Sequence, residues 1–209
     1  MGPSRIRVMI VDDHEVVRNG IAAILAPHSD VVVVAEASNG PEAILMFRAH
    51  RPDVTLLDLT MPDMDGVQVL RAIRAEFPES RFIVLTVHTG DDDIRRALEA
   101  GAQAYVLKTA TAVELVETVR AVRAGLRRLS RAAADRMREY PIAAHLTPRE
   151  LDVIRLLARG FTNKEIGAAL EVSETTVKWF VKNILQKLGV NDRTAAVTTA
   201  LERGILHPR

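Results

Sequence analysis

The chain has 209 residues, 48% hydrophobic and 26% charged, with no cysteine and a formal net charge of +1. The length suits one large domain or two small ones, while the missing cysteines exclude a disulfide scaffold, a thiolate metal site and a cysteine nucleophile. The charge is divided unevenly, because residues 1–125 contain 13 Lys and Arg against 18 Asp and Glu, and residues 126–209 contain 15 against 9. With no signal-peptide pattern and no apolar run of the roughly 18 residues that span a bilayer, we expect a cytoplasmic protein without a membrane partner.

The first half alternates strand-like and helix-like segments. Five short runs rich in Val, Ile and Leu lack polar alternation, as strands covered on both faces do: residues 6–11, 31–35, 54–59, 82–87 and 104–107. Helical patterns follow them at residues 16–25, 41–49, 67–76, 94–99 and from a capping box at Thr111 and Glu114 to about Gly125. Five β–α units predict an α/β doubly wound, five-stranded parallel sheet.

The second half begins with a basic segment and continues with helices alone. Residues 126–145 contain five Arg and end their helical pattern at Pro141, so we predict a linker there, either helical or flexible. Thr147 and Glu150 then start a helix that closes at Gly160. Further helices are expected at residues 163–170, at 174–188 after a Ser cap, and after Asp192. Residues 146–209 therefore predict a small all-α domain of four helices.

Polar side chains gather where the predicted strands end. Asp12 and Asp13 follow the first strand, Asp58 the third, Thr86 ends the fourth, and Lys108 follows the fifth. Ligand sites of open α/β sheets lie at this edge, and clustered carboxylates favour a hard divalent cation such as Mg²⁺. The cation, Lys108 and the Thr86 hydroxyl would surround anionic oxygens near Asp58, which makes Asp58 the candidate acceptor of a phosphoryl group.

Two other interpretations of the acidic residues exist. The strand ends are simply solvated and Lys108 pairs with one of them, or the chain is a phosphatase of the haloacid dehalogenase type. Such an enzyme needs a second Asp two residues after its nucleophile, and Thr60 stands there instead. His14 also follows the acidic pair, but no second His lies at ligand spacing, so we assign it to local packing or hydrogen bonding.

Residues 6–125 resemble the receiver domain of two-component response regulators, which has a flavodoxin-like fold. The resemblance is carried by Val11-Asp12-Asp13-His14, Asp58-Leu59-Thr60-Met61-Pro62, Gly66, Thr86 and Tyr105-Val106-Leu107-Lys108. It implies that a sensor histidine kinase phosphorylates Asp58, and that Lys108 binds a phosphoryl oxygen. It implies that Mg²⁺ is held by Asp12, Asp13, Asp58 and the Thr60 carbonyl, and that Thr86 and Tyr105 are a switch pair. Alternatively, the Tyr105 ring is packed permanently. Val87 stands where the family often has a smaller residue.

The helical half contains a helix-turn-helix pattern. Residues 163–167 and 173–178 flank a turn near Glu171, and the second helix would enter a major groove of DNA. Lys178 and Lys182 are four residues apart and share a helix face, beside Trp179. Alternatively, Lys178, Lys182 and Lys187 form an ordinary solvated face. The net charge does not distinguish these two interpretations, because residues 145–209 have only 10 basic residues against 7 acidic ones.

Residues 146–206 resemble the LuxR-type DNA-binding domain. The matching motifs are Leu146-Thr147-Pro148-Arg149-Glu150, Gly160, Thr162-Asn163-Lys164-Glu165-Ile166, Val172-Ser173, Thr176-Val177-Lys178, Lys187-Leu188-Gly189-Val190 and Arg193. The resemblance implies that Lys178, Trp179 and Lys182 enter the major groove. It places five further residues toward the DNA backbone: Thr162, Asn163, Lys164, Thr175 and Thr176. It also implies a homodimer formed through the last helix, where Val197 and Leu201 are either the seam or part of the core. Phe180 stands where the family commonly has His.

Together the two halves resemble a NarL/FixJ-type response regulator. We expect a receiver at residues 1–125, a linker at 126–145 and a DNA-binding domain at 146–209. Phosphorylation of Asp58 would favour a homodimer that binds double-stranded DNA in a sequence-specific way and regulates transcription. The chain would not be an enzyme in its own right, beyond slow Mg²⁺-dependent autophosphorylation and autodephosphorylation. One rival hypothesis is a phosphorylation-independent regulator whose receiver serves only for dimerisation. The other is a small-anion-binding or hydrolytic α/β protein with an accessory helical module.

Overall fold

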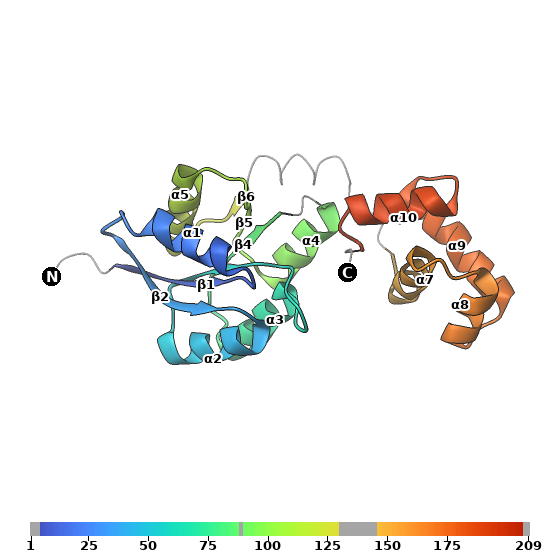
Figure 1. The fold of residues 1–209 in the computed structure, drawn as a ribbon, viewed down its shortest axis with the longest axis horizontal. Helices are drawn as coiled ribbons and strands as arrows, with labels where there is room; N and C mark the ends of the chain where they lie inside the picture. Colours follow the sequence, from blue (N-terminus) through green and yellow to red (C-terminus); the bar gives the residue numbers. More distant parts are fainter. Residues whose placement is uncertain (1–4, 88–89, 130–145, 207–209) are drawn as a thin grey trace. The chain divides into compact units, whose positions relative to one another are not determined.

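The computed structural model describes residues 5–87, 90–129 and 146–206, and Figure 1 shows the fold. These residues form two compact units. The first contains a parallel sheet with helices on both faces, and the second contains helices only. Among the described residues, no helix is long and apolar enough to cross a membrane.

The sheet has the strand order β2-β1-β3-β4-β5-β6, and all of its neighbouring strands are parallel. The strands are β1 (Ile6–Val11), β2 (Val31–Ala37), β3 (Val54–Leu57), β4 (Phe82–Thr86), β5 (Ala104–Leu107) and β6 (Arg128–Leu129). The predicted doubly wound parallel sheet is confirmed. Every residue of β3 and β4 is buried, which explains why these strands show no polar alternation in the sequence.

Five helices cover the sheet: α1 (Glu15–Leu25), α2 (Gly40–His50), α3 (Gly66–Glu76), α4 (Asp91–Ala100) and α5 (Ala112–Arg123). Helices α1 and α5 lie on one face, and α2 and α3 lie on the other (Figure 1). On the first face, Leu25 of α1 and Val119 of α5 join one hydrophobic core with Ile10, Leu56 and Ile83 of the strands. This core fixes the strand ends that carry the acidic residues.

The sixth strand is a feature that the sequence did not predict. Gly125, with φ +84°, turns the chain after α5, and the Arg128 amide then donates a 2.9 Å hydrogen bond to the Gln103 carbonyl. The Arg128 guanidinium also contacts Glu117 at 3.1 Å, and Leu129 lies opposite Tyr105 in the ladder. A strand of two residues is too short to show a hydrophobic period in the sequence. Its presence depends instead on the free edge of β5, with which its backbone pairs. The remainder of the predicted linker, residues 130–145, lies outside the described residues.

The described residues of the helical unit form α7 (Pro148–Ala158), α8 (Asn163–Leu170), α9 (Glu174–Leu188) and α10 (Arg193–Glu202), as the sequence predicted. Each begins at a side chain that accepts a hydrogen bond from a backbone amide three residues later: Thr147, Thr162, Ser173 and Asp192. Their buried faces share one core that includes Ile154, Ile166, Val177 and Ile184. This core holds α8 and α9 at the turn between them.

Candidate functional sites

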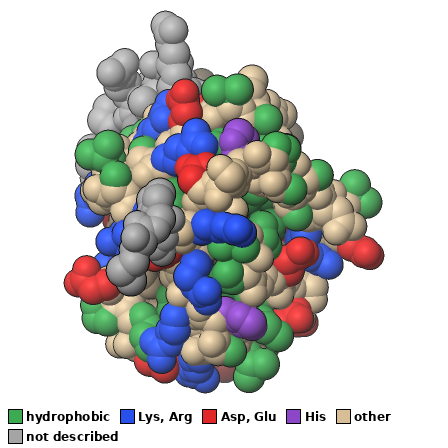
Figure 2. Space-filling model, turned by 90° about the vertical axis from the view of Figure 1, so that its left-hand side faces the viewer, with side chains coloured by type: hydrophobic (Ala, Val, Ile, Leu, Met, Phe, Trp, Pro, Cys, Tyr) green, Lys and Arg blue, Asp and Glu red, His purple; other side chains and the backbone are tan. Residues whose placement is uncertain are grey.

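An acidic cluster lies at the carboxyl edge of the sheet. The Asp58 amide donates a 2.9 Å hydrogen bond to the Val11 carbonyl, so the ends of β1 and β3 lie side by side. As a result, one side-chain ligand atom from each of Asp12, Asp13, His14 and Asp58 lies within 4.8 Å of the others. On the face of the protein that Figure 2 shows, acidic and basic side chains are mixed.

Lys108 joins the two buried carboxylates of this cluster. Its Nζ lies 2.6 Å from Asp12 Oδ2 and 2.7 Å from Asp58 Oδ2, and Asp12 and Asp58 are 1% and 4% exposed. Burial raises the pKa of Asp58, and the Asp12 carboxylate raises it further, against the lowering effect of Lys108. Burial would lower the pKa of Lys108, but its hydrogen bonds to both carboxylates outweigh burial and raise it. Two carboxylates thus share one ammonium group, and negative charge remains.

The loop after Asp58 adjoins the acidic cluster. The Thr60 amide donates a 3.3 Å hydrogen bond to Asp58 Oδ1, and the Thr60 side chain is exposed. Gly66 begins α3 against this loop, where a Cβ would overlap the carbonyl oxygen of Asp58. Glycine at position 66 therefore lets the loop close over the strand end.

The predicted switch residues lie on the two neighbouring strands. Thr86 and Tyr105 are both fully buried, and the Lys108 amide donates a 2.8 Å hydrogen bond to the Thr86 carbonyl. Thr86 thus lies on the strand next to Lys108. The Tyr105 side chain is buried within the sheet unit. Val87, which follows Thr86, is 65% exposed.

Sequence reasoning missed Arg18 and assigned His14 to local packing or hydrogen bonding rather than to metal binding. The Arg18 guanidinium donates a 2.8 Å hydrogen bond to the Asp12 carbonyl, so α1 helps to hold the end of β1. Its only signal in the sequence is its place one turn into the helix that follows the acidic pair. His14 Nδ1 lies 2.8 Å from Asp13 Oδ1 and 3.4 Å from Asp12 Oδ1.

The acidic cluster fits a divalent cation. Its oxygen donors are those that hard cations prefer, and the single ammonium group of Lys108 leaves negative charge for a cation to neutralise. Asp13 Oδ1 is buried and accepts no hydrogen bond from any described residue. A buried carboxylate oxygen without a donor is expected where a cation binds.

Helix α9 of the other unit exposes the residues that the sequence assigned to DNA. Lys178 and Lys182 are exposed, and Trp179 is 58% exposed with its ring edge against Phe180 at a centroid distance of 5.1 Å. Lys178 pairs with Glu174 of its own helix at 2.8 Å. Phe180 is half-buried and packs against the helical core, as a hydrophobic replacement of a core position would.

The smaller candidate residues have structural roles as well. Thr162 forms a capping box with Glu165, and Thr176 contacts Ser173 at the start of α9. Lys164 and Thr175 are exposed, whereas Asn163 is half-buried. Thr162 and Thr176 therefore have partners within the helix starts.

Lys187 and the two residues of the candidate dimer seam, Val197 and Leu201, differ in their burial. Lys187 belongs to the fold, because its Nζ lies 2.7 Å from the buried Glu150 carboxylate. On α10, Val197 packs against the core, and Leu201 is 43% exposed. Val197 thus serves the core, and Leu201 lies at the surface.

Comparison with known proteins assigns both units. Residues 8–120 match the model of the response regulator receiver domain, and residues 144–200 match that of the luxR family of bacterial regulatory proteins. The response regulator protein VraR of Staphylococcus aureus is 38% identical over 206 residues, which cover 96% of this chain and 99% of that protein.

Solved structures of response regulators are also similar. ChrA of a heme-sensing two-component system is 37% identical, with a TM-score of 0.58, over 97% of this chain and 100% of that one. RcsB of Salmonella enterica serovar Typhimurium, solved on promoter DNA with the phosphomimetic BeF3⁻, is 28% identical, with a TM-score of 0.74, over 94% and 98% of the two chains. The chain belongs to the response regulators that join a receiver domain to a LuxR-type DNA-binding domain. The two matched domains are thus those of a regulator with a receiver and a DNA-binding part.

Proposed function

We propose that Asp58 accepts a phosphoryl group from a sensor histidine kinase, and that its phosphorylation controls DNA binding by a homodimer. The observation that carries the proposal is the buried pair of carboxylates, Asp12 and Asp58, which share the single Lys108 ammonium group at 2.6 and 2.7 Å. A carboxylate oxygen of Asp58 attacks the phosphorus, the bond from phosphorus to the kinase histidine breaks, and Lys108 stabilises the negative oxygens.

The divalent cation of this site is Mg²⁺ in our proposal. Asp12, Asp13, Asp58 and the Thr60 carbonyl would hold it, and it would neutralise phosphoryl oxygens when bound. Thr86 and Tyr105 then respond to phosphorylation of Asp58. The Thr86 hydroxyl responds by contacting the phosphoryl group, and the Tyr105 ring responds through its position in the sheet unit. We place the receiver at residues 1–125, the linker at 126–145 and the DNA-binding domain at 146–209. A cytoplasmic location accords with these partners.

Labelling experiments test the phosphoacceptor. The full chain is incubated with acetyl phosphate and Mg²⁺, or with beryllofluoride and Mg²⁺, and followed by mass spectrometry and analytical ultracentrifugation. We expect the wild type to gain one phosphoryl group and to dimerise, and Asp58→Ala to do neither. Asp63→Asn is the matched control, because Asp63 is an exposed carboxylate of the same loop. Equal labelling of Asp58→Ala and the wild type would refute the assignment.

We further propose that α9 reads DNA through Lys178, Trp179 and Lys182. Two observations support this proposal. The three side chains are exposed, and their helix begins at a Ser173 cap directly after the turn. An exposed recognition helix of this kind can enter a major groove. The other candidates, Thr162, Asn163, Lys164, Thr175 and Thr176, lie near the helix starts, where amides and hydroxyls suit phosphate.

Salt-dependent binding tests the recognition helix. DNA selected by the wild type from a random pool is the probe, and Lys178→Ala and Lys182→Ala are each expected to weaken binding without unfolding the domain. Loss of one phosphate contact reduces the slope of log affinity against log salt by roughly one unit. Arg155→Ala removes one exposed charge from α7 and is the control. Unchanged affinity in both lysine variants would exclude this surface.

A further inference from the structure

His14 lies in the acidic cluster, where its side chain contacts two carboxylates and buries little surface. Its side chain is 68% exposed, and its Nδ1 lies 2.8 Å from Asp13 Oδ1. That carboxylate oxygen is buried, yet it accepts no hydrogen bond from the described residues, so the geometry of this contact is not that of a hydrogen bond. An imidazole nitrogen and a carboxylate oxygen, both of which can bind a metal ion, therefore lie at close range.

This spacing is typical of two ligands of one ion. Adjacent ligand atoms of an octahedral ion with bonds of ~2.1 Å lie about 3 Å apart. The ligand atoms of Asp12, Asp13, His14 and Asp58 together lie within 4.8 Å, so small side-chain movements suffice to place them around one centre. His14 is also held in place at its backbone, because its amide donates a 2.9 Å hydrogen bond to Asp12 Oδ1.

We propose that His14 supplies an imidazole ligand to the divalent-cation site and gives it a selectivity for later transition metals. Imidazole nitrogen is a preferred ligand of Co²⁺, Ni²⁺ and Zn²⁺, whereas Mg²⁺ is held by oxygen. The three carboxylates and the Thr60 carbonyl serve Mg²⁺, and the imidazole adds affinity only for metals that accept nitrogen. The inference rests on the divalent-cation site of the proposed function and deepens it.

Metal titration of the full chain tests the ligand. Co²⁺ is the probe, because its visible absorption changes with a nitrogen ligand, and Mg²⁺ is titrated in parallel by calorimetry. We expect His14→Asn to lower the Co²⁺ affinity by about tenfold or more, the usual effect of losing one contributor to a metal site, and to leave the Mg²⁺ affinity unchanged. The absorption bands of the bound Co²⁺ should shift in the same variant.

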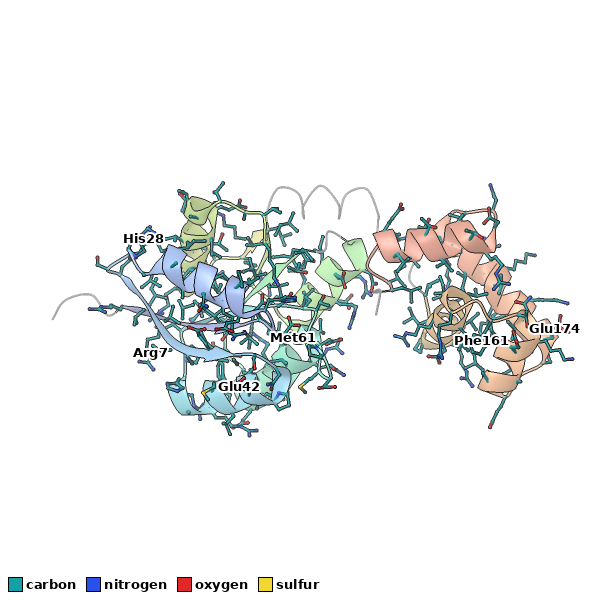
Figure 3. The ribbon with its side chains drawn as sticks, in the orientation of Figure 1. Arg7, His28, Glu42, Met61, Phe161 and Glu174 are labelled. Carbon is teal, nitrogen blue, oxygen red and sulfur yellow. The ribbon has the colours of Figure 1, made fainter. Side chains whose placement is uncertain are left out.

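His28→Asn is the matched control. His28 follows the end of α1, and Figure 3 shows it away from Met61, which belongs to the loop after Asp58. We expect this variant to bind both metals as the wild type does. Equal Co²⁺ affinity of His14→Asn and the wild type would overturn the proposal, and so would equal losses of Co²⁺ and Mg²⁺ affinity. If Asp13→Asn binds Mg²⁺ as the wild type does, the divalent-cation site itself is wrong, and this result is separate from the behaviour of His14.

Discussion

Asp58 destabilises the fold, although it is the centre of the proposed site. The Asp58 carboxylate is 4% exposed and shares the Lys108 ammonium group with Asp12. Burial and the neighbouring carboxylate raise its pKa, which means that its charged form is destabilised in the folded protein. At neutral pH, this charge therefore lowers the stability of the sheet unit.

Asp58→Asn should stabilise the sheet unit in the absence of divalent cations. The amide retains a hydrogen-bond acceptor for Lys108 and removes the surplus charge, and we expect a gain on the order of 1 kcal/mol in the free energy of unfolding. Calorimetry of the sheet-unit transition in a chelating buffer measures it. Mg²⁺ at ten times its dissociation constant should then stabilise only the wild type, by about 1.4 kcal/mol.

Asp63→Asn serves as the control for this measurement. It removes one charge from the exposed part of the same loop and should change stability by less than about 0.5 kcal/mol. A loss of stability in Asp58→Asn would mean that the ion pair with Lys108 more than offsets the burial of the carboxylate.

At the scale of single elements, helix α7 depends on an ion pair that the sequence does not reveal. Glu150 closes the capping box with Thr147, and its buried carboxylate also contacts Lys187 of α9 at 2.7 Å. Burial would raise the pKa of Glu150, but the hydrogen bonds from Lys187 and Thr147 outweigh it and lower the pKa. One side chain thus starts α7 and joins it to α9.

Glu150→Gln should destabilise the helical unit in a pH-dependent way. The amide preserves the cap and loses the charge, so we expect a cost of about 1–2 kcal/mol at pH 7. Because the folded pKa is below the ordinary value of 4.5, the charged group stabilises the fold above that value, and this contribution is lost as the pH falls through the folded pKa. Denaturant unfolding of the two proteins between pH 7 and pH 3 should therefore show curves that converge in acid.

A double-mutant cycle with Lys187→Gln separates the ion pair from the cap. If the two substitutions add independently, the contact between Glu150 and Lys187 does not stabilise the fold. If the two changes in stability are additive, the main role of Glu150 is to cap α7.

At the scale of the whole molecule, each unit has its own hydrophobic core and its own candidate site. We therefore expect the fragments 1–129 and 146–209 to fold separately, each with a helical circular dichroism spectrum and a cooperative thermal transition of its own. The fragment 146–209 should bind DNA without phosphorylation. A disordered fragment in either case would contradict this independence.

Fragment 1–125 tests the role of β6 in the first unit. It lacks the hydrogen bond from the Arg128 amide to Gln103 and the contact of Arg128 with Glu117. We expect it to fold and to be less stable than fragment 1–129 by about 1 kcal/mol. Equal stability would show that β6 adds nothing to the sheet.

The sequence alone determined the fold class, the strand ends with Asp12, Asp13, Asp58 and Lys108, and all four helices of the second unit. It could do so because buried parallel strands and capped helices leave local signals: continuous apolar runs, and a cap residue followed by an amphipathic stripe. The tertiary structure decided the rest, namely that Lys108 bridges two carboxylates, that Glu150 meets Lys187, that β6 joins the sheet, and that His14 faces Asp13. These contacts depend on distances between side chains and on a free strand edge, and no residue spacing along the chain specifies them.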